Sequence, residues 1–185
     1  MINKIIEEIK KCLENNLNIA ALSLSLILVD MCAQVEYPGI KVGERYRSWF
    51  DKYVAEHMRA FKDDDNIPWV SGQIAYDLRC NMLHAGDPDL TNTQSNINTF
   101  RLQTQNYSKY CYFGTHTTVA SHYDKTGEII DNRSITISVL DLCNTITDCV
   151  LDYYEKNKEK FSFSNKIVYV EDEVADFANK KFDKK

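Results

Sequence analysis

The sequence predicts an α+β protein that is mainly α-helical, an antiparallel helical bundle with a small antiparallel sheet inserted before the last long helix. Apolar residues recur at helical spacing before residue 89, short alternating runs follow, and the helical period returns near residue 140. At 185 residues the chain is long enough for one well-buried domain and too short for two ordinary ones. We therefore expect a single domain over 1–185, with a helical core at 1–88 and 139–158, a β elaboration at 97–138 and a C-terminal extension at 159–185.

The first two predicted helices differ in how their apolar residues are spread. Residues 2–15 carry isoleucines on one face and Lys and Glu on the other, which is typical of a surface helix. Residues 17–36 are apolar almost all round, which predicts the central buried helix, and Asp30 is the only charge between Leu17 and Val35. Ser23, Ser25 and Asp30 interrupt this run, and no signal-peptide pattern surrounds it. We expect a cytoplasmic protein without a membrane span.

The next two predicted helices cover residues 42–61 and 71–86. In the first, His57 falls among the apolar positions and is expected in the core, while Arg45, Lys52 and Arg59 repeat every seven residues on another face. This stripe is either a solvated face or an RNA-binding one. In the second, Ser71 fits an N-cap and Gly86 a helix C-terminus.

The β elaboration is predicted from three alternating runs, at residues 99–105, 110–123 and 128–139, with a hairpin turn at residues 124–127. A fifth helix is expected at residues 140–157, and residues 167–170 fit one further strand.

Composition limits the chemistry that the chain can carry. The net charge of −5 argues against a protein that binds nucleic acid over its whole surface, because such binding needs clustered Lys and Arg. The six cysteines form no CxxC motif and suit reduced thiols. His116 and His122 have no third ligand in view, so we expect no metal and no cofactor.

Arg79 and His84, five positions apart near the end of the fourth predicted helix, are the best candidates for catalysis. The planar arginine fork matches phosphate oxygens, and histidine accepts and returns a proton near neutral pH. Together they supply the parts of a phosphodiester-cleaving site that needs no metal. Asp77 and Asn81 fall on the same helical arc as His84.

The segment Arg79-Cys-Asn-Met-Leu-His84 resembles the Arg-x(4–6)-His signature of the HEPN superfamily, and the resemblance extends over roughly the first half of the chain. It implies a HEPN-like bundle and a metal-independent endoribonuclease that cleaves RNA through attack of the ribose 2′-hydroxyl. His84 would act as general acid or base, Arg79 would stabilise the phosphoryl charge, and Asn81 would assist as a polar contact. The family also implies a homodimer with a composite site, and a toxin–antitoxin or phage-defence setting.

Two other interpretations remain open. Arg79 could form a buried ion pair with Asp30 that ties the fourth helix to the second, because an isolated acid and base among apolar residues usually pair. His84 could be a helix C-terminal histidine bonded to a carbonyl. The chain would then be a catalytically silent HEPN-like module that binds RNA, a nucleotide, an antitoxin or another protein. The acidic balance, and Cys80 at a position that is commonly polar in the family, favour this alternative.

Overall fold

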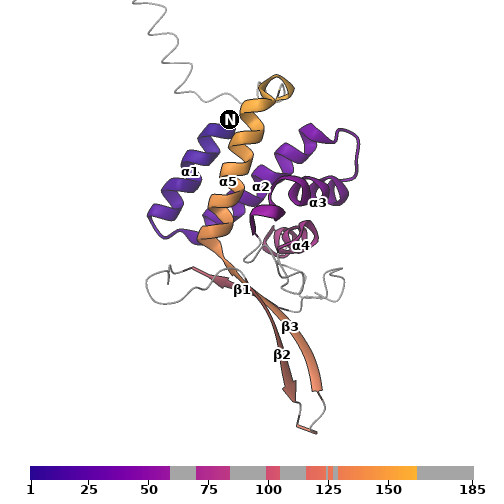
Figure 1. The fold of residues 1–185 in the computed structure, drawn as a ribbon. Helices are drawn as coiled ribbons and strands as arrows, with labels where there is room; N and C mark the ends of the chain where they lie inside the picture. Colours follow the sequence, from indigo (N-terminus) through magenta and orange to yellow (C-terminus); the bar gives the residue numbers. More distant parts are fainter. Residues whose placement is uncertain (59–69, 84–98, 105–115, 124, 127–128, 162–185) are drawn as a thin grey trace, which may run out of the picture.

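The computed structural model shows a bundle of α-helices with a sheet at one end (Figure 1). It describes residues 1–58, 70–83, 99–104, 116–123, 125–126 and 129–161. The described helices are α1 (Ile2–Glu14), α2 (Asn18–Glu36), α3 (Val42–Tyr53), α4 (Gly72–Leu83) and α5 (Val139–Lys156), with short 3₁₀ turns η1 (Ala55–Met58) and η3 (Lys158–Lys160). The mainly helical α+β class is therefore confirmed.

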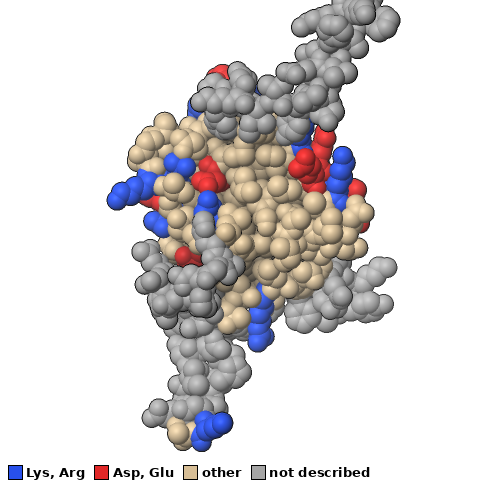
Figure 2. Space-filling model, turned by 180° about the vertical axis from the view of Figure 1, so that it is seen from behind, with Lys and Arg blue, Asp and Glu red and all other residues tan. Residues whose placement is uncertain are grey.

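Helix α2 lies at the centre of the bundle and packs against α1, α3, α4 and α5. Within the described residues it alone is long and apolar enough, by length and composition, to cross a membrane. Eight of its 19 residues are buried among the other helices, as in a core helix. The predicted central position of α2 is confirmed, although its neighbours leave one side of the helix, which includes Ile19 and Ile27, exposed. Figure 2, viewed from behind, shows that side as a broad uncharged surface with charged residues at its margins.

The predicted third helix is interrupted. The α-helical part ends at Tyr53, and the chain continues as the 3₁₀ turn η1, in which the His57 amide donates to the Val54 carbonyl at 2.9 Å. A 3₁₀ turn has three residues per turn, so the change breaks the phase of the apolar stripe. His57 is consequently exposed, and its predicted place in the core is wrong.

The sheet has strands β1 (Thr99–Gln103), β2 (His116–Tyr123) and β3 (Ile129–Ser138) in the order β1-β3-β2. β2 and β3 pair antiparallel, whereas β1 and β3 pair parallel, with Thr99 opposite Ser134. The predicted antiparallel sheet is wrong in this respect. Strand direction alternates along the chain as expected, but β3 lies between β1 and β2, so that β1 meets a strand of its own direction.

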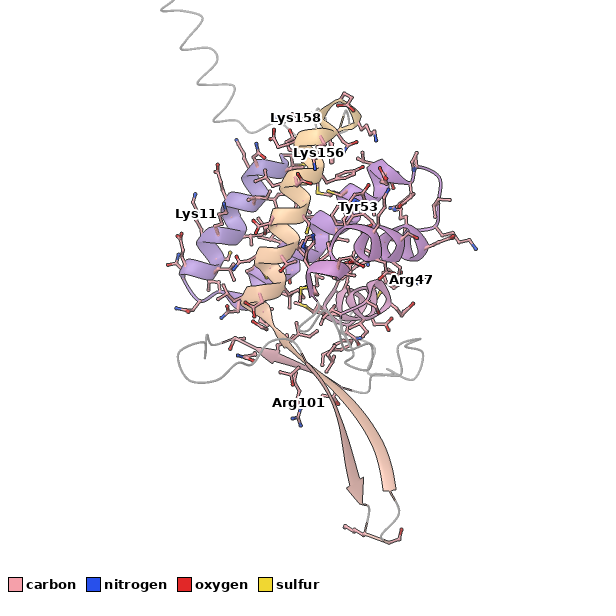
Figure 3. The ribbon with its side chains drawn as sticks, in the orientation of Figure 1. Lys11, Arg47, Tyr53, Arg101, Lys156 and Lys158 are labelled. Atoms are coloured by element: carbon pink, nitrogen blue, oxygen red, sulfur yellow. The ribbon has the colours of Figure 1, made fainter. Side chains whose placement is uncertain are left out.

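The sheet joins the helical core at one end. Ile135 and Ile137 of β3 are fully buried, and Phe100 and Leu102 of β1 pack against the core, whereas Arg101 between them points away from the helices (Figure 3). β3 runs straight into α5, where the Ser138 hydroxyl caps the helix by accepting from the Asp141 amide at 3.3 Å. The far ends of β2 and β3 extend away from the bundle (Figure 1). The predicted strand at 167–170 lies outside the described residues.

Candidate functional site

The N-terminus of α4 is held tightly against α3. The Gly72 amide donates to the Asp51 carboxylate at 2.6 Å, and the Ile74 amide donates to the Ser71 hydroxyl at 3.3 Å, which confirms Ser71 as the N-cap. A Cβ atom on Gly72 would collide with the backbone of Arg47, so only glycine permits this approach. These contacts fix the direction in which α4 carries residues 77–83.

Two arginines share one carboxylate between α2, α3 and α4. The Arg79 Nη2 atom of α4 donates to Asp30 Oδ2 of α2 at 2.8 Å, and Arg45 Nη2 of α3 lies 3.7 Å from Asp30 Oδ1. The side chains are 16%, 22% and 15% exposed for Arg79, Asp30 and Arg45. The expected pairing of Arg79 with Asp30 is therefore present in the structure, and Arg45 joins it. We call these three residues the Asp30 cluster.

The Asp30 cluster carries one more positive than negative charge, and its hydrogen bonds are incomplete. The Nε atoms of Arg45 and Arg79 and the Oδ1 atom of Asp30 are buried without a hydrogen-bond partner among the described residues. Burial lowers the pKa of Arg79, but the charge and hydrogen bond of Asp30, together with Cys80, more than offset this and raise it overall. The guanidinium therefore stays charged while part of its donor capacity is unused.

Aromatic rings line the same region. The guanidiniums of Arg47 and Arg79 lie 5.5 and 6.0 Å from the centre of the Tyr76 ring, at cation–π distances, and the Tyr46 ring lies 5.6 Å from it. Figure 3 shows Arg47 at the side of the molecule where α3 and α4 meet. Burial raises the pKa of both tyrosines, and Cys80 raises that of Tyr76 further. Neither hydroxyl is suited to accept or lose a proton near neutral pH.

Asp77 and Asn81 are engaged within α4 itself. Asp77 is buried, and its Oδ1 atom accepts from the Gln73 amide at 2.9 Å, whereas its Oδ2 atom is buried without a partner among the described residues. The Asn81 side chain donates to the Asp77 backbone carbonyl at 2.8 Å. Asn81 is thus half-buried and bonded to its own helix. His84 lies outside the described residues, as does Arg59.

The predicted basic stripe divides between two carboxylates. Arg45 belongs to the Asp30 cluster, whereas Lys52, one heptad later on α3, donates to Glu36 at the C-terminus of α2 at 2.7 Å. The two cations therefore serve different acids of the same helix.

Glu36 is the centre of a second network, which the sequence pattern did not single out. Its Oε1 atom accepts from Lys52 and from the Tyr53 hydroxyl at 2.8 Å, and its Oε2 atom accepts from the Tyr153 hydroxyl at 2.9 Å, with Lys160 Nζ at 3.8 Å. Figure 3 shows Tyr53 beside α5. Chiefly through the Lys52 hydrogen bond, the pKa of Glu36 falls from 4.5 to about 2. We call this set the Glu36 network.

An open cavity of about 450 Å³ lies between α3, η1 and α5. His57 and Lys52 contribute from one side and two acids of α5 from the other, and the full lining is Lys52, Tyr53, His57, Thr145, Asp148, Cys149 and Asp152. In the part of the chain that the structure describes, no three His, Cys, Asp or Glu side chains group as ligands of a metal ion would. Burial raises the pKa of Cys149 to about 11, so its thiol is protonated at neutral pH.

Comparison of the chain with protein-family models, with curated proteins and with solved structures found no match. The function must therefore be argued from the residues. Among the candidate positions, the structure brings Arg79, Asp30 and Arg45 together, keeps Asp77 and Asn81 nearby on α4, and places Lys52 in a separate network.

Proposed function

We propose that the protein is a metal-independent endoribonuclease of HEPN type that acts in the cytoplasm on single-stranded RNA. The observation that carries the proposal is the Asp30 cluster. It has a net positive charge, and the Nε atoms of both arginines, although buried, have no hydrogen-bond partner among the described residues. A half-buried guanidinium that is oriented by a carboxylate is well suited to bind a phosphate, since it need not reorganise when charge develops on the phosphoryl oxygens.

The chemistry follows from these groups and from the resemblance to the HEPN superfamily. A base removes the proton of the ribose 2′-hydroxyl, the 2′-oxygen attacks phosphorus, and the bond to the 5′-oxygen breaks as an acid protonates it. The products are a 2′,3′-cyclic phosphate and a 5′-hydroxyl. In the proposal His84 transfers protons, Arg79 stabilises the phosphoryl oxygens, Asn81 assists as a polar contact, and Asp30 orients Arg79.

The direct test is cleavage of single-stranded RNA by purified protein in EDTA. We expect products that end in 2′,3′-cyclic phosphate and no cleavage of single-stranded DNA, which lacks the nucleophile. His84→Ala should reduce the rate by about two to four orders of magnitude and melt near the wild-type temperature, because a general acid–base group contributes in that range. Cleavage that requires magnesium, or that persists unchanged in His84→Ala, would refute the mechanism.

A second candidate function is a HEPN-like module that binds RNA, a nucleotide or a protein such as an antitoxin, without turnover. One observation favours it: the Arg79 side chain is only 16% exposed and already donates to Asp30 at 2.8 Å. An ion pair of this kind can have a purely structural role, in which it ties α4 to α2. The same assay separates the two functions, since a binding module would shift labelled RNA in a gel at low salt and leave it intact.

A further inference from the structure

An open groove on the surface of the bundle lies directly beside the Asp30 cluster. It has a volume of about 230 Å³ and is lined by Ile27, Asp30, Met31, Gln34 and Arg45. The first four of these residues are three, one and three positions apart on α2 and so form a single strip along that helix, and Arg45 contributes from α3. Asp30 and Arg45 belong to both the groove and the cluster. A ligand in this groove would therefore lie next to the charges of the cluster.

The groove combines apolar side chains with one unused amide. Ile27 is 37% exposed, and Met31 is half-buried. Gln34, at the end of the strip, is exposed, and its side chain makes no hydrogen bond to any of the residues that the structure describes. A mainly apolar lining with a few polar groups that fix orientation is the usual composition of a ligand site.

The size and shape of the groove suit one flat ring system. Pockets that hold drug-sized molecules have volumes of roughly 300–1,000 Å³, so a groove of about 230 Å³ suits a smaller group. The guanidinium of Arg45 is held at two of its nitrogens, because Nη1 donates to the Ile40 carbonyl at 3.4 Å and Nη2 lies 3.7 Å from Asp30 Oδ1. A planar guanidinium held in this way can stack on an aromatic ring. The unstacked bases of single-stranded RNA are recognised by such stacking and by hydrogen bonds to their edges.

We propose that the groove binds an adenine base of the RNA and that Gln34 determines this preference. A glutamine amide presents one acceptor and one donor side by side. This pair matches the amino group at N6 and the acceptor N7 of adenine, whereas the same edge of guanine presents two acceptors. A pyrimidine has a smaller ring and would cover less of Ile27 and Met31. Adenine therefore satisfies both the amide and the apolar side chains of the groove.

The inference rests on the proposed function, because the phosphate of the same nucleotide would lie at the Asp30 cluster. Gln34 stands one helical turn beyond Asp30, about 6 Å along the helix axis, so one nucleotide can reach both. The charges also agree with this placement. The excess positive charge of the cluster attracts the phosphate, whereas the uncharged side chains of Ile27, Met31 and Gln34 suit a base that is neutral at physiological pH.

The test measures base preference with a ligand that the proposed mechanism cannot cleave. Short labelled oligodeoxynucleotides of uracil carry adenine, guanine, cytosine or uracil at one central position, and fluorescence anisotropy at low salt gives the four dissociation constants. Wild type should bind the adenine oligonucleotide about fivefold more tightly than the others, or better, as expected for a bidentate base contact. Gln34→Met keeps the length of the side chain without its donor and acceptor, and it should bind all four equally. Asn144→Leu, which removes an exposed amide of α5 outside the groove, is the matched control and should keep the preference.

Several outcomes would overturn the inference: wild type that binds the four oligonucleotides equally or binds none, Gln34→Met that keeps the preference, or Asn144→Leu that loses it. Because Gln34 is exposed, its replacement leaves the core intact, and far-UV circular dichroism checks this. If Gln34→Met does not fold, Gln34→Ala removes the same donor and acceptor and provides the same measurement. Adenine preference in a protein that cleaves no RNA counts against the proposed nuclease alone. RNA cleavage without any base preference counts against the adenine groove alone.

Discussion

The two carboxylates of α2, Asp30 and Glu36, each meet a cation from α3, yet their surroundings differ. Both oxygens of Glu36 accept short hydrogen bonds, from Lys52, Tyr53 and Tyr153, and the pKa of the carboxyl falls to about 2. Asp30 accepts one short hydrogen bond and stands beside two arginines with unused donors. The Glu36 network is fully hydrogen-bonded and stabilises the fold, whereas the Asp30 cluster keeps an excess positive charge and buried donors without partners among the described residues.

If the Asp30 cluster binds the phosphate of RNA, the largest expected effect is on RNA cleavage. Arg79→Ala should lower kcat/KM by about two to three orders of magnitude, the usual range for removing a group that stabilises transition-state charge. Lys156→Ala is the matched control, because Lys156 is exposed and, among the described residues, pairs only with Asp152 of the same helix, at 2.7 Å. It should cut RNA at the wild-type rate. Equal losses in both variants would show that general positive charge, and not the Asp30 cluster, drives activity.

The second effect concerns the free energy of unfolding, to which Glu36 should contribute more than Asp30. Glu36→Ala should lower the free energy of unfolding by about 2–4 kcal/mol, because it leaves the hydroxyls of Tyr53 and Tyr153 unpaired on rigid rings. Asp30→Ala should cost about 1–2 kcal/mol, since long arginine side chains can turn toward solvent. Urea denaturation of both variants measures this, and a larger loss in Asp30→Ala would invert the comparison.

The smallest effect is a pH dependence specific to Glu36. Because the pKa of Glu36 is lower in the folded chain than its ordinary value of 4.5, the ionised carboxylate stabilises the fold above pH 4.5. That contribution is lost progressively as the pH falls from 4.5 to about 2. Stability of wild type should therefore fall more steeply than that of Glu36→Gln over this interval, in urea titrations at pH 5, 3.5 and 2.5. Parallel curves would mean that Glu36 is not held ionised by its partners.

Local patterns were reliable where each residue interacts with its own neighbours in the chain. The spacing of isoleucines predicts α1, and Ser71 caps α4 as its residue type suggests. The Asp30–Arg79 pair was also predictable, because an isolated charge in an apolar helix requires a partner, whichever helix supplies it. The sequence thus determined that α2 is central and that Asp30 is paired.

Other features depend on where distant segments meet, and local sequence does not encode that. The partners of Glu36 come from α3, α5 and η3, up to 124 positions away, and nothing near Glu36 distinguishes it from a solvated helix-end glutamate. His57 follows the helical period in sequence, but the chain leaves the α-helix after Tyr53.

Strand alternation shows which face of a strand is buried but not which edge it pairs with, so only the tertiary structure decided that β1 lies beside β3. Likewise, the apolar composition of α2 indicates that much of its surface must be buried. Only the packing of the neighbouring helices decided which side of α2 remains exposed to solvent. Amino-acid type determined the elements and their charges. Long-range packing determined the strand pairing, the partners in the Glu36 network and the exposed side of α2. The interaction energies that decide these features arise between groups that only folding brings together.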